Sequence, residues 1–233
     1  MKHKHLFILC PPASGSTLLW QILRTSPQVA SLPGEGQVLA REILFNRRRW
    51  DPLMPVDWEQ VRKAWEEAWD MSKPVLLEKS PPHLVRARQL EEFFPQSRFV
   101  VMMRNPYAFC EGIKRRWKNE LGYAAIARLW VTWAGCQVAN LRQLRHALFL
   151  SYEELTDDAQ GQCRRLLQFV PELQELHPER EFSVFEKVQV VENLNSRQIA
   201  RLTPGDILEI NSVLKDSPEL VKDFQYGFIN DPA

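Results

Sequence analysis

The stretch LFILCPPASGSTLLWQIL (residues 6–23) decides the fold, because it changes within a few residues from a buried strand to a helix. Residues 6–10 are uniformly apolar and stop at two prolines, which is typical of a strand buried on both faces of a parallel sheet. Small residues then form a turn at 11–15, and apolar side chains recur at helical spacing over 16–25. We therefore predict a strand, a tight turn and a helix in that order.

The same alternation continues along the chain. Short apolar runs predict further strands at 75–77, 98–103 and 147–151. Helical spacing predicts an amphipathic helix at 58–71, one through Leu84, Leu90 and Phe93, and others at 107–117, 123–145, 153–169 and 206–214. Residues 178–195 have no clear pattern and are expected to be irregular. Strands that alternate with helices predict one α/β domain over residues 1–233, with helices on both faces of a parallel sheet.

Composition excludes several classes of protein. A formal net charge of +1 provides no global field that would attract nucleic acid or a membrane surface. No apolar stretch approaches the ~18 residues of a membrane span, and the run at 6–10 is too short for a signal peptide. The four cysteines are scattered without a C-x-x-C pair, so we expect reduced thiols, no metal site and a cytoplasmic location.

The turn before the first predicted helix has the properties of an anion site. Free backbone N–H groups and the helix dipole converge there. Gly15 permits close approach of the backbone, and Ser14, Ser16 and Thr17 supply hydroxyl groups. The P-loop pattern G-x-x-x-x-G-K-[ST] is absent, which weakens an interpretation as a kinase or NTPase. The alternative is a purely structural turn, since many such junctions are rich in small residues.

A second anion site is predicted at Arg104, directly after the strand at 98–103. Ligands of open α/β sheets bind beyond the carboxyl ends of the strands, so Arg104 is expected at the same edge as the Gly15 turn. A guanidinium there can hold a phosphate through two parallel hydrogen bonds. Arg115 and Arg116 on the following helix can add to this site, or they are solvated surface charges, and Arg104 itself can instead cap or pair a loop.

Four segments resemble the sulfotransferases that use 3′-phosphoadenosine 5′-phosphosulfate (PAPS) as donor. Residues 12–19 resemble the 5′-phosphosulfate loop, and residues 99–106 resemble the strand and turn at the 3′-phosphate. Residues 77–81 resemble the strand-end lysine motif, and residues 148–155 resemble a later strand that ends in Tyr-Glu-x-Leu. All four occur in family order. The resemblance implies a P-loop-NTPase-like sheet and transfer of a sulfuryl group to an acceptor hydroxyl or amine, with adenosine 3′,5′-bisphosphate (PAP) as product and no metal.

The resemblance also assigns roles to individual residues, and Lys79 would be the cation beside the sulfuryl group. The implied donor-binding residues are Ala13, Ser14, Gly15, Ser16, Thr17, Arg104, Gly112, Arg116 and Tyr152. Two of these positions depart from the family pattern. Ala13 stands where the family usually has lysine or arginine, and Gly112 where it usually has a serine on the 3′-phosphate.

The general base is expected to be Glu35. Gly34 and Glu35 stand where the tyrosylprotein and bacterial sulfotransferases carry a Gly-Glu pair whose carboxylate is the base, so this branch is the closest match. The cytosolic small-molecule enzymes use a histidine two residues after the lysine, and that position here is Pro81. His83, four residues after Lys79, is the rival base.

Alternatives remain open at this stage. A nucleotide kinase or NTPase of related fold, or a catalytically inactive relative that binds nucleotide, would share the same phosphate-binding turns. The acceptor can be a small alcohol, a carbohydrate, a lipid or a tyrosyl peptide, and the run at 47–49 favours a solvated turn over an acidic acceptor. Four tryptophans are expected in the core: Trp65, Trp69, Trp130 and Trp133.

Overall fold

A five-stranded sheet in the order β2-β3-β1-β4-β5 forms the centre of the computed structural model, which describes residues 3–117, 120–184 and 187–230. Every neighbouring pair of strands is parallel. The strands are β1 Lys4–Leu9, β2 Val29–Ser31, β3 Val75–Lys79, β4 Arg98–Met103 and β5 Ala147–Ser151. The predicted α/β fold, a parallel sheet with helices on both faces, is confirmed.

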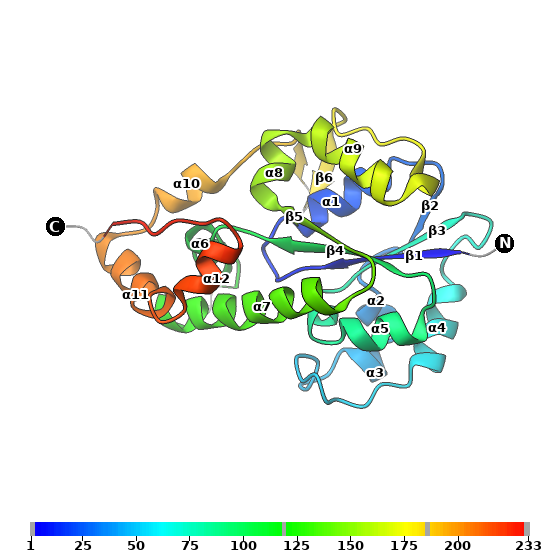
Figure 1. Ribbon diagram of the computed structural model, residues 1–233, viewed down its shortest axis with the longest axis horizontal. Coiled ribbons are helices and arrows are strands. Elements are labelled where there is room, and N and C mark those ends of the chain that lie inside the picture. The colour runs from blue at the N-terminus through cyan, green and yellow to red at the C-terminus, as the bar shows by residue number, and fades with distance from the viewer. Residues whose placement is uncertain (1–2, 118–119, 185–186, 231–233) are drawn as a thin grey trace.

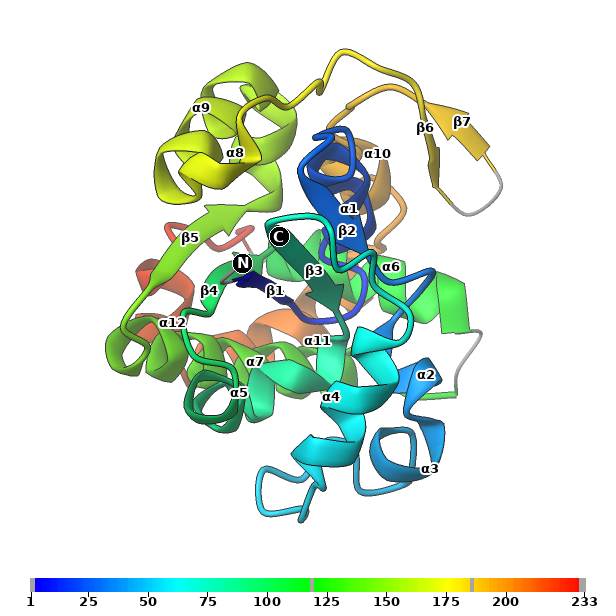
Figure 2. The same ribbon diagram turned by 90° about the vertical axis from the view of Figure 1, so that its right-hand side faces the viewer.

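Helices cover both faces of this sheet, as Figures 1 and 2 show. On one face lie α1 Ser16–Leu23, α8 Tyr152–Asp157 and α9 Ala159–Phe169, and on the other lie α4 Trp58–Glu66, α5 Ala87–Phe93 and α7 Tyr123–Gln143. Alternate strand residues supply the two cores, because successive side chains point to opposite faces. Phe7 and Phe99 belong to the α7 side, while Ile8 and Val100 belong to the α1 side.

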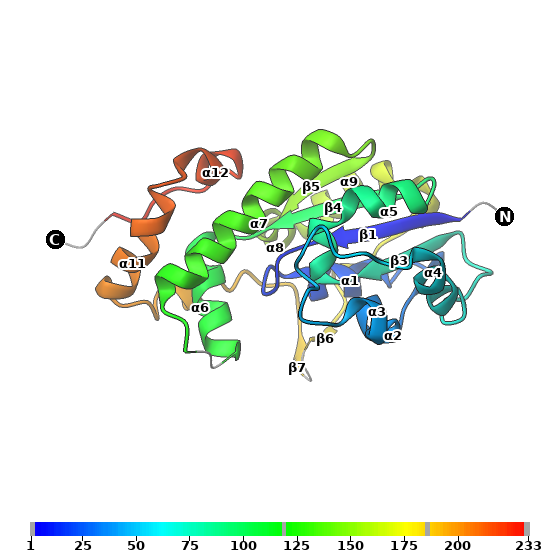
Figure 3. The ribbon, with the colours of Figure 1, turned by 90° about the horizontal axis from the view of Figure 1, so that it is seen from below.

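The remaining elements lie around the sheet and at its ends. They are α2 Gly36–Leu39, α3 Arg41–Leu44, the 3₁₀ turn η1 Pro81–Val85, α6 Pro106–Trp117, the 3₁₀ turn η2 Pro171–Leu173, α10 Asn195–Ile199, α11 Pro204–Leu214 and α12 Pro218–Asp223. A short antiparallel hairpin, β6 Phe182–Val184 with β7 Lys187–Gln189, stands apart from the sheet. Figure 3 shows α6, this hairpin and the α2–α3 segment on the same side of the molecule.

Several boundaries differ from the sequence-based prediction. The predicted helix at 153–169 is two helices, because Asp158 leaves helical geometry and its side chain caps α9 by accepting a hydrogen bond from the Gly161 N–H at 2.9 Å. The predicted helix at 58–71 ends at Glu66. The expectation of an irregular segment at 178–195 is wrong in part, since it contains the β6–β7 hairpin and the start of α10. The three-residue strand β2 was too short to show a pattern.

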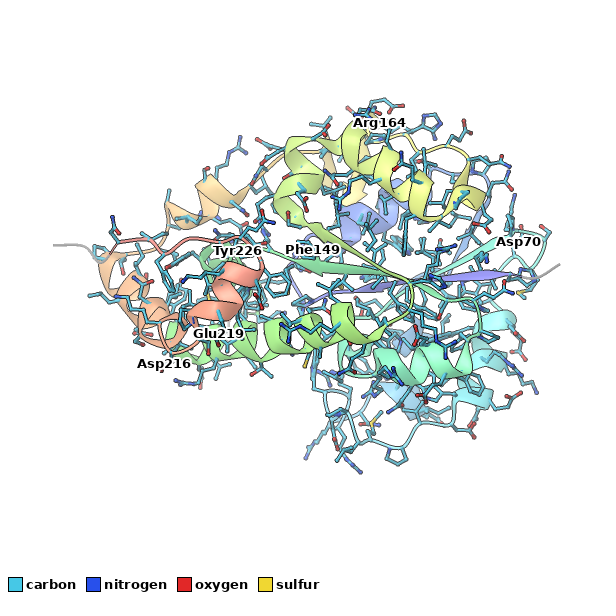
Figure 4. The ribbon with its side chains drawn as sticks, viewed as in Figure 1. Asp70, Phe149, Arg164, Asp216, Glu219 and Tyr226 are labelled. Carbon is cyan, nitrogen blue, oxygen red and sulfur yellow. The ribbon has the colours of Figure 1, made fainter. Side chains whose placement is uncertain are left out.

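The C-terminal segment folds back over the carboxyl ends of the strands. The ring centroid of Phe224 lies 5.4 Å from that of Phe149 on β5, and the ring centroid of Tyr226 lies 6.1 Å from that of Trp130 on α7. Figure 4 labels Phe149 and Tyr226. The Tyr226 hydroxyl donates a hydrogen bond to Glu153 Oε2 at 2.9 Å. These contacts attach the segment that follows α12 to β5, α7 and α8.

Trp130 connects this layer to β4. Its indole N–H donates to the Arg104 carbonyl at 2.9 Å, and the ring is fully buried. We expect Trp130→Ala to lower the free energy of unfolding by about 3–5 kcal/mol, from lost burial and an unpaired buried carbonyl. Urea denaturation followed by circular dichroism measures this change. Trp117→Ala, at a residue 44% exposed, is the control and should cost less than about 1 kcal/mol; equal losses would contradict the prediction.

Candidate active site

A cavity of about 820 Å³ lies at the carboxyl edge of the sheet, and it contains most of the residues predicted from the sequence. The predicted residues that line it are Ala13, Gly15, Ser16, Thr17, Glu35, Lys79, Arg104, Arg115, Arg116 and Tyr152. The two predicted anion sites therefore face one space. Of the predicted residues, all of them described, Ser14, Gly112 and the rival base His83 are not in this lining.

The β1–α1 turn reaches the cavity through an unusual backbone. Ala13 has φ +59° and Gly15 has φ +84°, both in the left-handed region that costs energy for a residue with a side chain. The first N–H groups of α1 have no intrahelical acceptor, and they point out of the helix start at Ser16 and Thr17. The Ser14 hydroxyl points elsewhere, because it is buried and donates to the Pro11 carbonyl at 2.6 Å. Ser14 thus shapes the turn from within.

Gly15 is required by packing as well as by its φ angle. A Cβ at this position would lie 2.3 Å from Cδ2 of Tyr152, which is closer than any real contact. The Tyr152 ring therefore sits directly against the turn. Its hydroxyl donates to the Glu192 carbonyl at 3.0 Å and accepts from the Leu194 N–H at 3.1 Å, so Tyr152 also holds the segment before α10 at the cavity.

Arg104 forms the second corner, and neutral oxygen atoms surround it. Its Nε donates to Asn195 Oδ1 at 2.9 Å, its Nη1 donates to the Ala13 carbonyl at 3.1 Å, and its Nη2 donates to Gln198 Oε1. The guanidinium carbon lies 3.9 Å from the centroid of the Tyr152 ring. An arginine has five N–H donors, so these three bonds leave capacity for a ligand. Because none of the three partners is charged, the positive charge of Arg104 is not neutralised by them.

Gly112 packs beneath the side chain of Gln198. A Cβ at Gly112 would lie 3.1 Å from Gln198 Nε2 and 3.7 Å from the Ala13 Cβ, so the glycine leaves room for Gln198. Gln198 Nε2 in turn donates to Glu111 Oε2 at 2.7 Å. Gln198 thus joins Arg104 to the buried carboxylate of Glu111 on α6. Glu111 is next to Gly112, the position at which the family pattern has a serine.

Arg115 and Arg116 approach the cavity from the end of α6. Arg115 Nε donates to Glu111 Oε1 at 2.8 Å, and the Arg115 side chain is 57% exposed. Arg116 is also exposed, and partial burial together with the nearby Arg115 lowers the pKa of its guanidinium. Each arginine lines the cavity, and the exposed Arg115 is also paired with the buried carboxylate of Glu111.

Lys79 and Glu35 meet in the cavity between the two corners. Lys79 ends β3, and its Nζ lies 2.7 Å from Glu35 Oε1. The Lys79 side chain is 10% exposed and that of Glu35 is 30% exposed, so the pair is accessible from one side only. Gln37 Nε2 donates to the other oxygen of Glu35 at 2.5 Å. A carboxylate and an ammonium group are thereby fixed side by side.

Glu78 and His83 lie behind this pair, out of the cavity. Both side chains are 1% exposed, and His83 Nε2 is 3.3 Å from Glu78 Oε2. Burial raises the pKa of Glu78 to about 7, although hydrogen bonds from Ser80 and Gly36 oppose the shift. Burial, with a smaller contribution from Arg86, lowers the pKa of His83 to about 3. The environment of His83, enclosed by the rings of Trp58 and Trp65, does not favour it as the base.

The other expectations concern the core and metals. The four tryptophans predicted to be core are buried, with exposures of 0–5%. No group of three His, Cys, Asp or Glu side chains that could hold a metal ion occurs in the described part of the chain. The helices described include none that is long and apolar enough to cross a membrane.

Sequence reasoning missed three side chains of the site: Gln37, Asn195 and Gln198. Asn195 and Gln198 lie three residues apart on α10, which places them on one side of that helix. They are more than 90 residues from Arg104 in the chain, and no local pattern connects them to it. Gln37 carried a weak signal, because it stands two residues after the predicted base.

The comparison with known families agrees with this geometry. A family model described as the sulfotransferase family matches residues 5–173. This range contains the β1–α1 turn, Glu35, Glu78 and Arg104. The chain belongs to the sulfotransferase family. The predicted membership is thereby confirmed, and the match covers the four segments that carried the resemblance.

Solved structures share the fold of this sulfotransferase. The sulfotransferase domain of the Synechococcus PCC 7002 olefin synthase superimposes with a TM-score of 0.65 at 19% identity, over 98% of each chain. A sulfotransferase from Alicyclobacillus acidocaldarius has a TM-score of 0.60 at 13% identity, over 97% of this chain and 98% of the other. A mouse sulfotransferase solved with PAP has a TM-score of 0.50 at 12% identity, over 96% and 88%. At these identities the likeness shows the fold alone.

One curated relative is the nodulation protein NoeE of Sinorhizobium fredii. It is 25% identical over 130 residues, which are 48% of this chain and 31% of that protein. The sulfotransferase described here thus spans less than a third of the length of NoeE. Whether it lies nearest to the tyrosylprotein and bacterial branch stays a prediction.

The raised pKa of Glu78 makes the stability of this sulfotransferase dependent on pH. The folded state holds a proton on Glu78 up to about pH 7, whereas the reference pKa is 4.5. Folding therefore binds a proton between these values, and stability falls as pH rises from about 4.5 to about 7. Glu78→Gln removes this loss, so its Tm should rise relative to wild type between pH 5 and pH 8. The gain at pH 8 should be on the order of 2–3 kcal/mol.

Calorimetric melting at both pH values tests this. Ser97→Ala, which removes a buried hydroxyl elsewhere, should show the same Tm difference from wild type at pH 5 and pH 8. A pH-independent Tm difference for Glu78→Gln would contradict the assignment.

Proposed function

We propose that this chain transfers the sulfuryl group of PAPS to an acceptor hydroxyl or amine, with Glu35 as general base. The observation that carries the proposal is the Lys79–Glu35 pair, 2.7 Å apart, in one cavity with two anion-binding corners. The corners are suited to a nucleotide with phosphates at separate positions. Family membership supports sulfuryl transfer, and the mouse relative of the same fold was solved with PAP.

The chain's own residues fit this donor. N–H groups at the start of α1, together with Ser16 and Thr17, would hold the 5′-phosphate, and Gly15 keeps the turn open. Arg104 has N–H donors left for the 3′-phosphate, with Arg116 at the same cavity. Tyr152 would keep the guanidinium flat against the turn. Gly112 would act indirectly, by leaving room for Gln198.

The reaction forms a bond from the acceptor atom to sulfur and breaks the bond from sulfur to the 5′-phosphate oxygen. Glu35 takes the proton of the acceptor, and PAP departs. Lys79 has three N–H donors and spends one on Glu35, so two remain for the oxygen atoms on which negative charge grows. Since Ala13 supplies no cation, Lys79 carries more of this stabilisation. Catalysis is then mainly positioning and electrostatics.

The acceptor class stays open between small alcohols, carbohydrates, lipids and tyrosyl peptides. Phe45, Arg49, Trp50 and Trp117 line the cavity beyond the reactive pair, so its wall is aromatic and basic. A cytoplasmic location is proposed as well, and the four free thiols suit a reducing compartment.

An inactive nucleotide-binding relative is the second candidate, favoured by the missing cation at Ala13. Labelled PAPS offered with a panel of the four acceptor classes separates the two. Transfer to any acceptor supports the enzyme. Binding of PAP by calorimetry with no transfer to any of them supports the inactive relative.

Substitution of Glu35 or Lys79 should affect turnover more than the binding of PAP. Glu35→Gln should lower kcat about 10²–10⁴-fold by removing the base, and Lys79→Ala about 10²–10³-fold by removing the cation. Both should keep PAP affinity within about threefold, because other residues hold the phosphates. Glu42→Gln, an exposed glutamate on the neighbouring helix α3, is the matched control. An unchanged kcat in Glu35→Gln would exclude Glu35 as base.

Arg104 should decide recognition of the 3′-phosphate. PAP and adenosine 5′-phosphate differ only in that group, so their affinity ratio isolates its contribution. A charge-assisted bond is worth about 1.5–3 kcal/mol, and Arg104→Gln should therefore shrink the ratio about tenfold or more. Arg201→Gln, which removes an arginine that donates to Glu111 on α6, should leave the ratio unchanged. The assignment fails if calorimetry gives the same ratio for wild type and Arg104→Gln.

A further inference from the structure

Gly36, the residue that follows Glu35, is held through both of its backbone polar groups by buried side chains. The Gly36 N–H donates to Glu78 Oε1 at 2.9 Å, and the Gly36 carbonyl accepts from the indole N–H of Trp65 at 3.0 Å. Glu78 is 1% exposed and Trp65 is fully buried. The first residue of α2, next to the candidate base, is thereby fastened to the interior of the protein.

A second connection runs through Ser80. Its hydroxyl donates to Glu78 Oε1 at 2.5 Å and accepts from the Gln37 N–H at 3.0 Å. The side chain of Gln37 in turn donates to Glu35 at 2.5 Å. Both backbone N–H groups after Glu35 therefore depend on one carboxylate oxygen, one of them directly and the other through a hydroxyl.

We infer that Glu78 is the positioning residue of this site, and that its buried carboxylate holds the 35–37 segment so that Glu35 meets Lys79. This inference rests on the proposed role of Glu35 as base. Glu78 itself does not touch the cavity, because neighbouring strand residues point to opposite sides. Lys79 faces the cavity, whereas Glu78 faces Trp65 and His83. The end of β3 thus supplies Lys79, which pairs with Glu35, and Glu78, which anchors the segment that carries Glu35.

The fit around Gly36 explains why the anchor is specific. A Cβ there would lie 2.8 Å from Glu78 Oε1 and 2.8 Å from Cε2 and Nε1 of Trp65. The backbone can approach the carboxylate this closely only because residue 36 has no side chain. The segment has little freedom to shift, and the 2.7 Å contact of Glu35 with Lys79 follows from this attachment.

The surroundings of Glu78 let it serve in either protonation state. His83 from η1 faces its carboxylate directly, whereas Lys79, Glu35 and Cys10, the residue after β1, interact with it electrostatically. Oε1 accepts from Gly36 and Ser80, while Oε2 faces His83. A proton on Oε2 leaves Oε1 an acceptor, so the attachment does not require a charge. Glutamine has an oxygen acceptor of the same shape, whereas leucine has none.

Three variants test the positioning role: Glu78→Leu, Glu78→Gln and Ser80→Ala. With PAPS and the best acceptor of the panel, Glu78→Leu should lower kcat about 100-fold, the scale of a small misplacement of a reacting group. Ser80→Ala should lower kcat about tenfold, because the Gln37 N–H loses its partner. Glu78→Gln should recover most of the rate lost in Glu78→Leu. All three should keep the KM for PAPS and the affinity for PAP within about threefold.

A second measurement does not require turnover. Reductive methylation of Lys79, followed by mass spectrometry, should be several-fold faster in Glu78→Leu and Ser80→Ala, because Glu35 no longer covers the amine. Ser97→Ala, which deletes a buried hydroxyl away from the site, is the matched control and should change neither readout. If Glu78→Leu does not fold, Ser80→Ala carries the test alone.

The outcomes separate the two proposals. Wild-type protein that transfers no sulfuryl group overturns the proposed function, and the methylation rates still test the anchor. Active wild-type protein whose kcat and Lys79 methylation are unchanged in Ser80→Ala and Glu78→Leu overturns the positioning role. A fall in kcat that Glu78→Gln does not recover also overturns it, since the carboxylate would then act through its charge.

Discussion

Parallel pairing of β1 with both β3 and β4, and of β4 with β5, is the constraint on which the rest of this structure depends. Parallel strands end at the same edge, so residues far apart in the chain become neighbours there. The turn after β1, Lys79, Arg104 and Tyr152 all follow from that one arrangement. Gln137 of α7 secures it, because its side-chain amide donates to carbonyls at the ends of β1 and β4, at 2.7 and 3.1 Å.

The two cationic side chains at this edge, Lys79 and Arg104, have different kinds of hydrogen-bond partner. Lys79 is paired with a carboxylate, whereas Arg104 is held by a backbone carbonyl and two side-chain amide oxygens. Neutral acceptors fix the direction of a guanidinium without cancelling its charge, so Arg104 retains attraction for an anion. Burial of that charge is costly, and stacking on Tyr152 offsets part of the cost. The neutral partners therefore orient the Arg104 guanidinium without neutralising its positive charge.

One of the two departures from the family pattern, Gly112, has a structural counterpart. Gly112 makes room for Gln198, which links Arg104 to Glu111 and brings α10 against α6. A serine there would meet Gln198 Nε2, because even a Cβ would lie 3.1 Å from it. Glycine at position 112, in place of the family's serine, therefore accompanies the side chain of Gln198 on α10. The cation missing at Ala13 has no substitute at that position, and the cations that line the cavity among the described residues are Lys79, Arg49, Arg104, Arg115 and Arg116.

The sequence by itself determined strands β1, β3, β4 and β5, the β1–α1 turn and the expectation that Lys79 and Arg104 share one edge. Those features are local, or they follow from the single rule that parallel strands end together. Only the tertiary structure decided that Ser14 points inward, that Asn195 and Gln198 hold Arg104, and that Glu78 anchors the loop of Glu35. Hydrogen bonds between residues 42–94 positions apart depend on how layers pack, and no periodicity in the chain encodes them.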